Sequence, residues 1–164
     1  MRIMKNLWSA ALFALPVLAG AQRPSAVKPP FEVMQANVAE IKNYAEKERW
    51  MANVDLWKLA LAQPARYSEE DSTRMEALLE RIRYNVARIR NTPEKDRWET
   101  NIRLWRVLID ARGAVTKAVA ARIQPDIQAL ATNIAGIDIT AEHERWQANR
   151  ELWETVASRT IAAF

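Results

Sequence analysis

The sequence predicts an all-α protein made of three tandem αα-hairpins, and three observations carry this prediction. A motif of the form [E/D]RWxxNxxLW occurs three times, over 48–57, 96–105 and 144–153. Upstream of each copy, apolar residues recur at intervals of three and four, as one face of a helix requires. No segment shows the alternation of a strand, so we expect six helices in a short solenoid or a compact bundle.

The repeat has a period of 48 residues, and such internal duplication constrains the fold more strongly than any single motif. Residues 37–57, 85–105 and 133–153 align with one another, and isoleucine recurs at Ile41, Ile89 and Ile137. All six tryptophans after residue 21 lie in the motif, in pairs seven residues apart. The copies span about 27–74, 75–122 and 123–164.

The first 21 residues resemble a cleavable signal peptide. Arg2 and Lys5 precede an apolar run over 7–18, which ends in the small residues Ala19-Gly20-Ala21. About 20 apolar residues are needed to span a bilayer, so an uncleaved membrane anchor is the less favoured alternative. We expect a mature chain from Gln22, without a transmembrane segment, in the periplasm or secreted. An extended lead-in over 22–29 would precede one helical-repeat domain over 30–164.

Each copy begins with one amphipathic helix and continues with a second. The stripe of the middle copy is Met75, Leu79, Ile82, Val86 and Ile89, and it returns 48 residues away in both directions. The second helix carries the face Trp98, Ile102, Trp105, Leu108 and Ile109. The predicted helices are 30–43, 45–63, 68–91, 93–112, 116–138 and 141–162.

Capping and breaking residues support these boundaries. Ser68 and Thr116 are predicted N-caps of first helices, and Asn43, Thr92 and Thr140 are predicted N-caps of second helices. Pro64 and the pair Arg112-Gly113 follow the second helices of the first two copies. Pro125 falls inside the fifth helix.

One position favours an open stack over a closed bundle. Four residues after the first tryptophan of the motif stand Val54, Ile102 and then Arg150. A terminal repeat needs a polar outer face, and the last copy becomes charged at this position. We therefore expect the third hairpin to end an open solenoid.

The tryptophans and asparagines of the motif are the candidate ligand-binding residues. A stripe at helical spacing is more often core, and we favour that role over an aromatic platform for a small apolar ligand. The candidates are Trp50, Asn53, Trp57, Trp98, Asn101, Trp105, Trp146, Asn149 and Trp153.

The asparagines also suggest how each hairpin is held in register. Asn37 lies seven residues before the predicted turn and Asn53 nine after it, so an antiparallel pair would bring them to the same height. A buried amide needs a partner. We expect contacts between Asn37 and Asn53, Asn85 and Asn101, and Asn133 and Asn149, made directly or through a backbone group or water.

Glu46, Glu94 and Glu142 each precede an arginine by three residues. An acid in the first turn of a helix and an i,i+3 pair with Arg49, Arg97 or Arg145 is the favoured interpretation. The alternative is that the three carboxylates converge as an acid/base or metal site.

Other signatures of catalysis are missing from the sequence. There is no cysteine and one histidine, His143, so the usual zinc sites cannot be built. Only Gly113 and Gly136 follow the leader, which excludes a glycine-rich phosphate loop. We expect no cofactor and no metal, and the sequence does not support an enzyme.

Charge argues against nucleic acid as a partner. The net charge of +4 falls to +2 once Arg2 and Lys5 leave with the leader. Arg81 and Arg88 fall on one flank of the apolar stripe, and Arg83 and Arg90 fall on the other.

We expect an exported, non-catalytic binding or assembly module whose partner is a protein or an envelope component. A carrier of a small apolar or aromatic ligand is the alternative.

Overall fold

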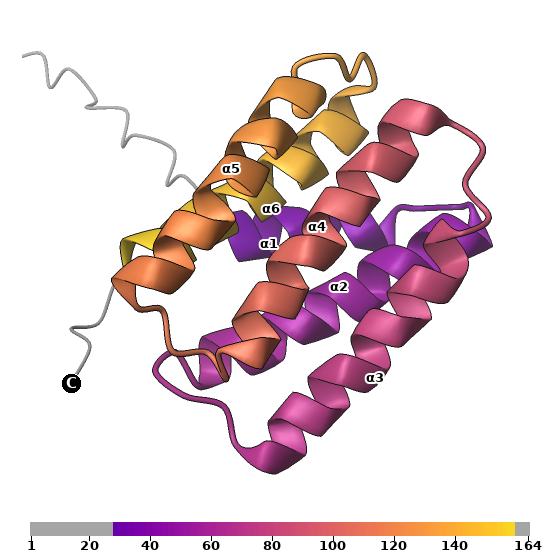
Figure 1. Ribbon diagram of the computed structural model, residues 1–164. Helices are drawn as coiled ribbons and strands as arrows, with labels where there is room; N and C mark the ends of the chain where they lie inside the picture. The colour runs from indigo at the N-terminus through magenta and orange to yellow at the C-terminus, as the bar shows by residue number, and fades with distance from the viewer. Residues whose placement is uncertain (1–27, 160–164) are drawn as a thin grey trace, which may run out of the picture.

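The computed structural model describes residues 28–159, which fold into six helices joined by short loops (Figure 1). They are α1 Pro30–Ala39, α2 Tyr44–Ala62, α3 Glu69–Val86, α4 Thr92–Asp110, α5 Lys117–Ile134 and α6 Thr140–Ser158. The all-α prediction and the number of helices are confirmed. The predicted leader, its cleavage at Gln22 and most of the 22–29 lead-in lie outside the described residues.

The first helix of each copy ends earlier than its apolar stripe. α1, α3 and α5 stop at Ala39, Val86 and Ile134, whereas the stripe continues to Ile41, Ile89 and Ile137. These isoleucines lie in the loops and still pack against the core. Apolar spacing therefore marks burial beyond the point where helical hydrogen bonding stops.

The N-caps are partly as predicted. Ser68 and Thr116 accept hydrogen bonds from the backbone N–H groups of Asp71 and Val119, and Asn43 accepts one from that of Glu46. The predicted caps Thr92 and Thr140 are wrong, because both residues already lie within their helices. Asn91 caps α4, and Ile139 occupies the N-cap position of α6 without a side-chain hydrogen bond.

The six helices close into a ring around a pseudo-threefold axis. α2, α4 and α6 form the inner set, and their tryptophans meet at the axis; α1, α3 and α5 lie outside them. Each helix packs against its neighbours in the chain, and α1 packs extensively against α6, which closes the ring (Figure 1). The structure is a compact bundle.

The expected open solenoid is therefore wrong, and the position that suggested it faces outward. Val54 lines a groove with Val38 of α1, and Ile102 lines the equivalent groove with Val86 of α3. Arg150 interacts with Gln147 and Glu154 on its own helix. A charge at this position changes an outer groove and leaves the contacts between repeats unaffected.

Within residues 28–159, every helix is too short or too polar to cross a bilayer.

Candidate functional site

Two layers of tryptophan fill the axis of the bundle. Trp50, Trp98 and Trp146 form one triangle, with ring centroids 4.8–4.9 Å apart and the rings edge to face. The second layer repeats this arrangement at 4.6–4.7 Å with Trp57, Trp105 and Trp153. All six side chains are at most 1% exposed. Edge-to-face contacts of this kind add to the stabilisation that comes from burial alone.

Three asparagines form a closed hydrogen-bond ring between the two layers. The amide Nδ2 of Asn53 donates to Oδ1 of Asn149, that of Asn149 to Asn101, and that of Asn101 to Asn53, at 2.9–3.0 Å. Each Oδ1 also accepts a hydrogen bond from a tryptophan Nε1 of the second layer, at 2.8–2.9 Å. Both acceptor sites of every Oδ1 are thus occupied in a fully buried layer.

The predicted asparagine pairs within each hairpin are wrong. Asn37 donates to Glu144 and to the carbonyl of Val33, and Asn85 donates to the carbonyl of Arg81. Asn133 accepts from Arg97 and donates to the carbonyl of Pro93. Two side chains at the same height along a hairpin meet only if they also point toward each other around their helices. The motif asparagine points to the axis, where it meets the same residue of the other repeats.

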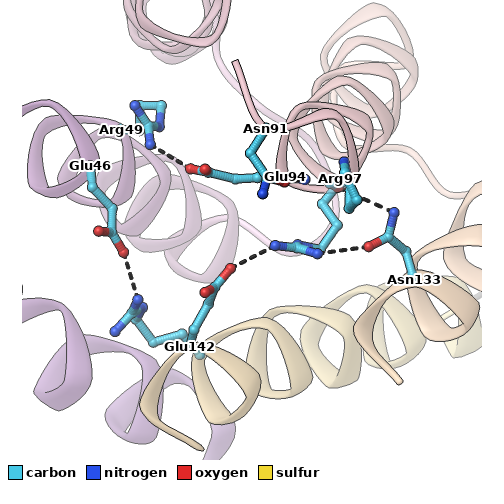
Figure 2. Close-up of polar contacts among 9 residues, drawn as sticks. Glu46, Arg49, Asn91, Glu94, Arg97, Asn133 and Glu142 are labelled. Carbon is cyan, nitrogen blue, oxygen red and sulfur yellow. Dashed lines mark hydrogen bonds and ion pairs between the residues drawn. The ribbon is translucent and has the colours of Figure 1, made fainter. Parts of the chain in front are cut away.

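Ion pairs between repeats close the end of the axis where the inner helices begin. Arg49 pairs with Glu94 at 2.7 Å, Arg97 with Glu142 at 2.6 Å and Arg145 with Glu46 at 2.7 Å. Figure 2 shows Arg97 reaching both Glu142 and Asn133. The predicted pairs within one helix are wrong, because each arginine crosses to the next repeat; the first-turn position of the glutamates is confirmed.

Each of these arginines also lies over a tryptophan of the next repeat. The guanidinium carbons of Arg49, Arg97 and Arg145 are 5.6–5.8 Å from the ring centroids of Trp98, Trp146 and Trp50. The Nε atoms of all three arginines are buried and have no hydrogen-bond partner. The negative faces of the indole rings therefore compensate part of the cost of burying these cations.

The three carboxylates do converge, but the arginines separate them. Burial raises the pKa of Glu46; the Arg145 guanidinium opposes this, and Glu142 and Glu94 add to it. Burial lowers the pKa of Arg145, because it disfavours the charged form of the guanidinium. Among the described residues, no three acidic, histidine or cysteine side chains are arranged to hold a metal ion. The alternating glutamates and arginines hold neighbouring repeats together through ion pairs.

Troughs run along the outside of the bundle over the inner helices α2 and α4. The α2 trough is floored by Lys47, Met51, Val54, Asp55, Lys58 and Leu59 and flanked by α1 and α3. It comprises grooves of 320 Å³ and 570 Å³, which share Asp55 and Lys58. Part of the equivalent α4 trough, between α3 and α4, measures 400 Å³.

The repeats differ along the outer faces of the inner helices. At the position of Met51, α4 carries Glu99 and α6 carries Gln147. Beside the α4 trough Arg103 pairs with Asp126 of α5 at 2.7 Å, and Arg106 pairs with Glu80 of α3 at 3.2 Å. On the outer face of α6 the side chains bond to one another, Gln147 to Glu151 and Arg150 to Glu154.

All nine predicted ligand-binding residues lie together on the axis. They are Trp50, Asn53, Trp57, Trp98, Asn101, Trp105, Trp146, Asn149 and Trp153, and every one is at most 1% exposed. None of them lines the grooves described above. The arrangement supports the core role that the sequence favoured. The trough residues were missed, and the signal that could have found them was the difference between copies at positions 51, 99 and 147.

Comparison with protein-family models, with curated proteins and with solved structures finds no match to this chain.

Proposed function

We propose that this chain is an exported, non-catalytic binding or assembly module of the cell envelope or the medium. In this proposal it resides in the periplasm or is secreted, and its partner is a protein or an envelope component. The leader-like residues 1–21 support export. The outer troughs supply the surface on which a partner would bind.

One observation carries the proposal. The residues that recur in all three copies bond to one another at the axis, as the Asn53, Asn101 and Asn149 ring does. Residues that differ between copies, such as Met51, Glu99 and Gln147, lie on the outer faces of the inner helices, and Met51 and Glu99 line the troughs. A protein that keeps its axis uniform and varies its outer surface is suited to recognition, because fold and specificity then reside in separate residues.

The test is photo-crosslinking in the native cells. A photoreactive amino acid placed at position 51, 99 or 147 samples equivalent points on the outer faces of the three inner helices, and we expect a discrete adduct from at least one of them. The full chain, leader included, should be recovered from the periplasm or the medium. Adducts at none of the three positions, or retention of the chain in the cytoplasm, would overturn the proposal.

The alternative is a carrier for a small apolar or aromatic ligand held between the inner helices. Such a ligand would have to separate the tryptophans within a layer, whose ring centroids are 4.6–4.9 Å apart. Tryptophan emission separates the two proposals. A carrier requires emission that shifts when an apolar ligand is added, and the binding module requires emission that does not respond.

A further inference from the structure

The α2 trough has the dimensions of a binding groove for a helix. α1 and α3 both pack against α2, yet they do not pack against each other within residues 28–159. The floor runs from Lys47 to Leu59, which at 1.5 Å per residue is about 18 Å long. Three turns of a second helix fit that length.

The floor of the α2 trough is more apolar than the equivalent outer faces of α4 and α6. Met51, Val54 and Leu59 are apolar, and Met51 is 43% exposed, one of few large apolar side chains so accessible in the described part of the chain. The same three positions are Glu99, Ile102 and Val107 on α4, and Gln147, Arg150 and Thr155 on α6. Met51 is exposed, Leu59 is half-buried and Val54 lies at the bottom of the groove, so the trough offers an apolar floor with polar edges, as interaction sites do.

The rim of the α2 trough is basic. Lys47, Lys58, Arg74 and Arg81 line it, against one acid, Asp55. The side chains of Lys58, Arg74 and Arg81 are 47–62% exposed. Each of them pairs with a neighbouring acid, Asp55, Asp71 or Glu48, but uses only part of its N–H donors, so a partner's carboxylates can bond to the donors that remain exposed.

We propose that the α2 trough binds an acidic amphipathic helix of a partner protein. Its apolar residues would lie on Met51, Val54 and Leu59, and its flanking carboxylates would meet the basic rim. This inference rests on the proposed binding function and adds the chemistry of the partner.

Other occupants fit the trough less well. A flat anionic bilayer meets Arg74 and Arg81 at the rim before it reaches the buried Val54. An extended peptide would need free backbone groups, and those of α2 are used within the helix. The chain's own residues 22–28 carry Arg23 and Lys28 and no acid, so they have the same sign of charge as the rim and would be repelled by it.

The experiment measures the affinity of synthetic helical peptides for the full mature chain. One 14-residue probe carries leucines on one face and glutamates on both flanks; a second carries lysines in place of the glutamates. We expect the acidic probe to bind at least about tenfold more tightly than the basic one, with a difference that shrinks as salt is added. Equal affinities would overturn the proposal.

Matched variants locate the binding. Met51→Glu introduces the residue that stands at position 99, and it should weaken the acidic probe by about tenfold or more because a carboxylate then faces the probe's apolar face. Gln147→Glu makes the equivalent change on the outer face of α6 and should leave the affinity unchanged. Loss in both variants, or in neither, would contradict the assignment.

Three further outcomes would assign the trough to a different occupant. Dimerisation of the wild type that Met51→Glu abolishes would identify a second copy. Binding to phosphatidylglycerol vesicles that Met51→Glu abolishes would identify a membrane. Tighter probe binding after deletion of residues 160–164 would identify the chain's own C-terminus. Crosslinks from position 99 or 147 without probe binding would leave the proposed function standing and overturn this inference alone.

Discussion

The indole Nε1 of Trp105 donates a hydrogen bond to Oδ1 of Asn53, at 2.9 Å, across the axis between the second and first repeats. The two residues are 52 positions apart in the chain and both are fully buried. Two further bonds of this kind link the third repeat to the second and the first to the third. Every repeat therefore donates to one neighbour and accepts from the other.

Asn53→Ala should destabilise the protein by about 3–5 kcal/mol. It removes the acceptor of both Trp105 Nε1 and Asn101 Nδ2 and leaves Asn149 without one of its donors. The free energy of unfolding in urea measures the effect. Asn85→Ala is the control, since its amide donates to a backbone carbonyl at the surface, and it should cost about 0.5 kcal/mol or less. Similar losses in the two variants would show that the asparagine ring does not hold the repeats together.

Arg145→Glu tests the ion pair with Glu46 that joins the third repeat to the first. Arg145 is 7% exposed and faces Glu46, so the reversed charge places a buried carboxylate opposite a half-buried one and should cost about 3–5 kcal/mol. Lys58→Glu, in the exposed pair with Asp55, should cost no more than about 1 kcal/mol.

The double variant Glu46→Arg with Arg145→Glu decides whether the pairing itself matters. It restores opposite charges at the two positions, and urea unfolding should recover part of the loss seen in Arg145→Glu alone. No recovery would mean that the packing of Arg145 on Trp50 outweighs its ion pair.

The raised pKa of Glu46 predicts that the free energy of unfolding depends on pH. Burial raises the pKa of its carboxyl above the ordinary value of 4.5, so the folded chain holds more protons than the unfolded chain between 4.5 and the raised value. The contribution of Glu46 to the free energy of unfolding therefore falls as pH rises through that window.

Glu46→Gln removes this titration and isolates its effect from those of the other carboxyl groups. The stability of the variant relative to the wild type should rise as the pH increases from 4.5 through the raised pKa, measured by urea unfolding in matched buffers. A relative stability that falls with pH would mean that the attraction of Arg145 outweighs burial at this site.

Sequence reasoning identified the helices because their causes are local. Apolar spacing at Met75, Leu79 and Ile82, and the caps at Ser68 and Thr116, act within a few residues, and both are visible in one copy of the repeat. The period of 48 residues then extended the assignment to all six helices.

The partners of the inner helices could not be predicted in the same way. Periodicity shows which face of a helix is buried but not against what, and Arg145 meets Glu46 from 99 residues away. Closure depends on the angle between hairpins and on the packing of α1 against α6, which no short motif encodes. The α2 trough was missed for the same reason, since Met51 is informative only once its position is known to face outward.

Gly113→Ala should destabilise the protein by about 2–4 kcal/mol, because two costs combine at this position. Gly113 has a φ of +77°, which a residue with a Cβ rarely adopts, and a Cβ would lie 2.7 Å from the Tyr67 ring. That ring is 4% exposed, and the backbone N–H of Tyr67 donates to the carbonyl of Arg112, so the ring has little freedom to withdraw.

Gly136→Ala is the matched control at the other glycine of the described chain. Its nearest neighbour would be a backbone oxygen at 3.6 Å, an ordinary contact, and its φ lies outside the positive region. Alanine there restricts the unfolded chain and should change stability by no more than about 1 kcal/mol, in the stabilising direction. Thermal and urea unfolding of both variants measure the contrast. A Gly113→Ala variant as stable as Gly136→Ala would show that the Tyr67 ring and the 111–116 loop are less tightly packed than the structure has them.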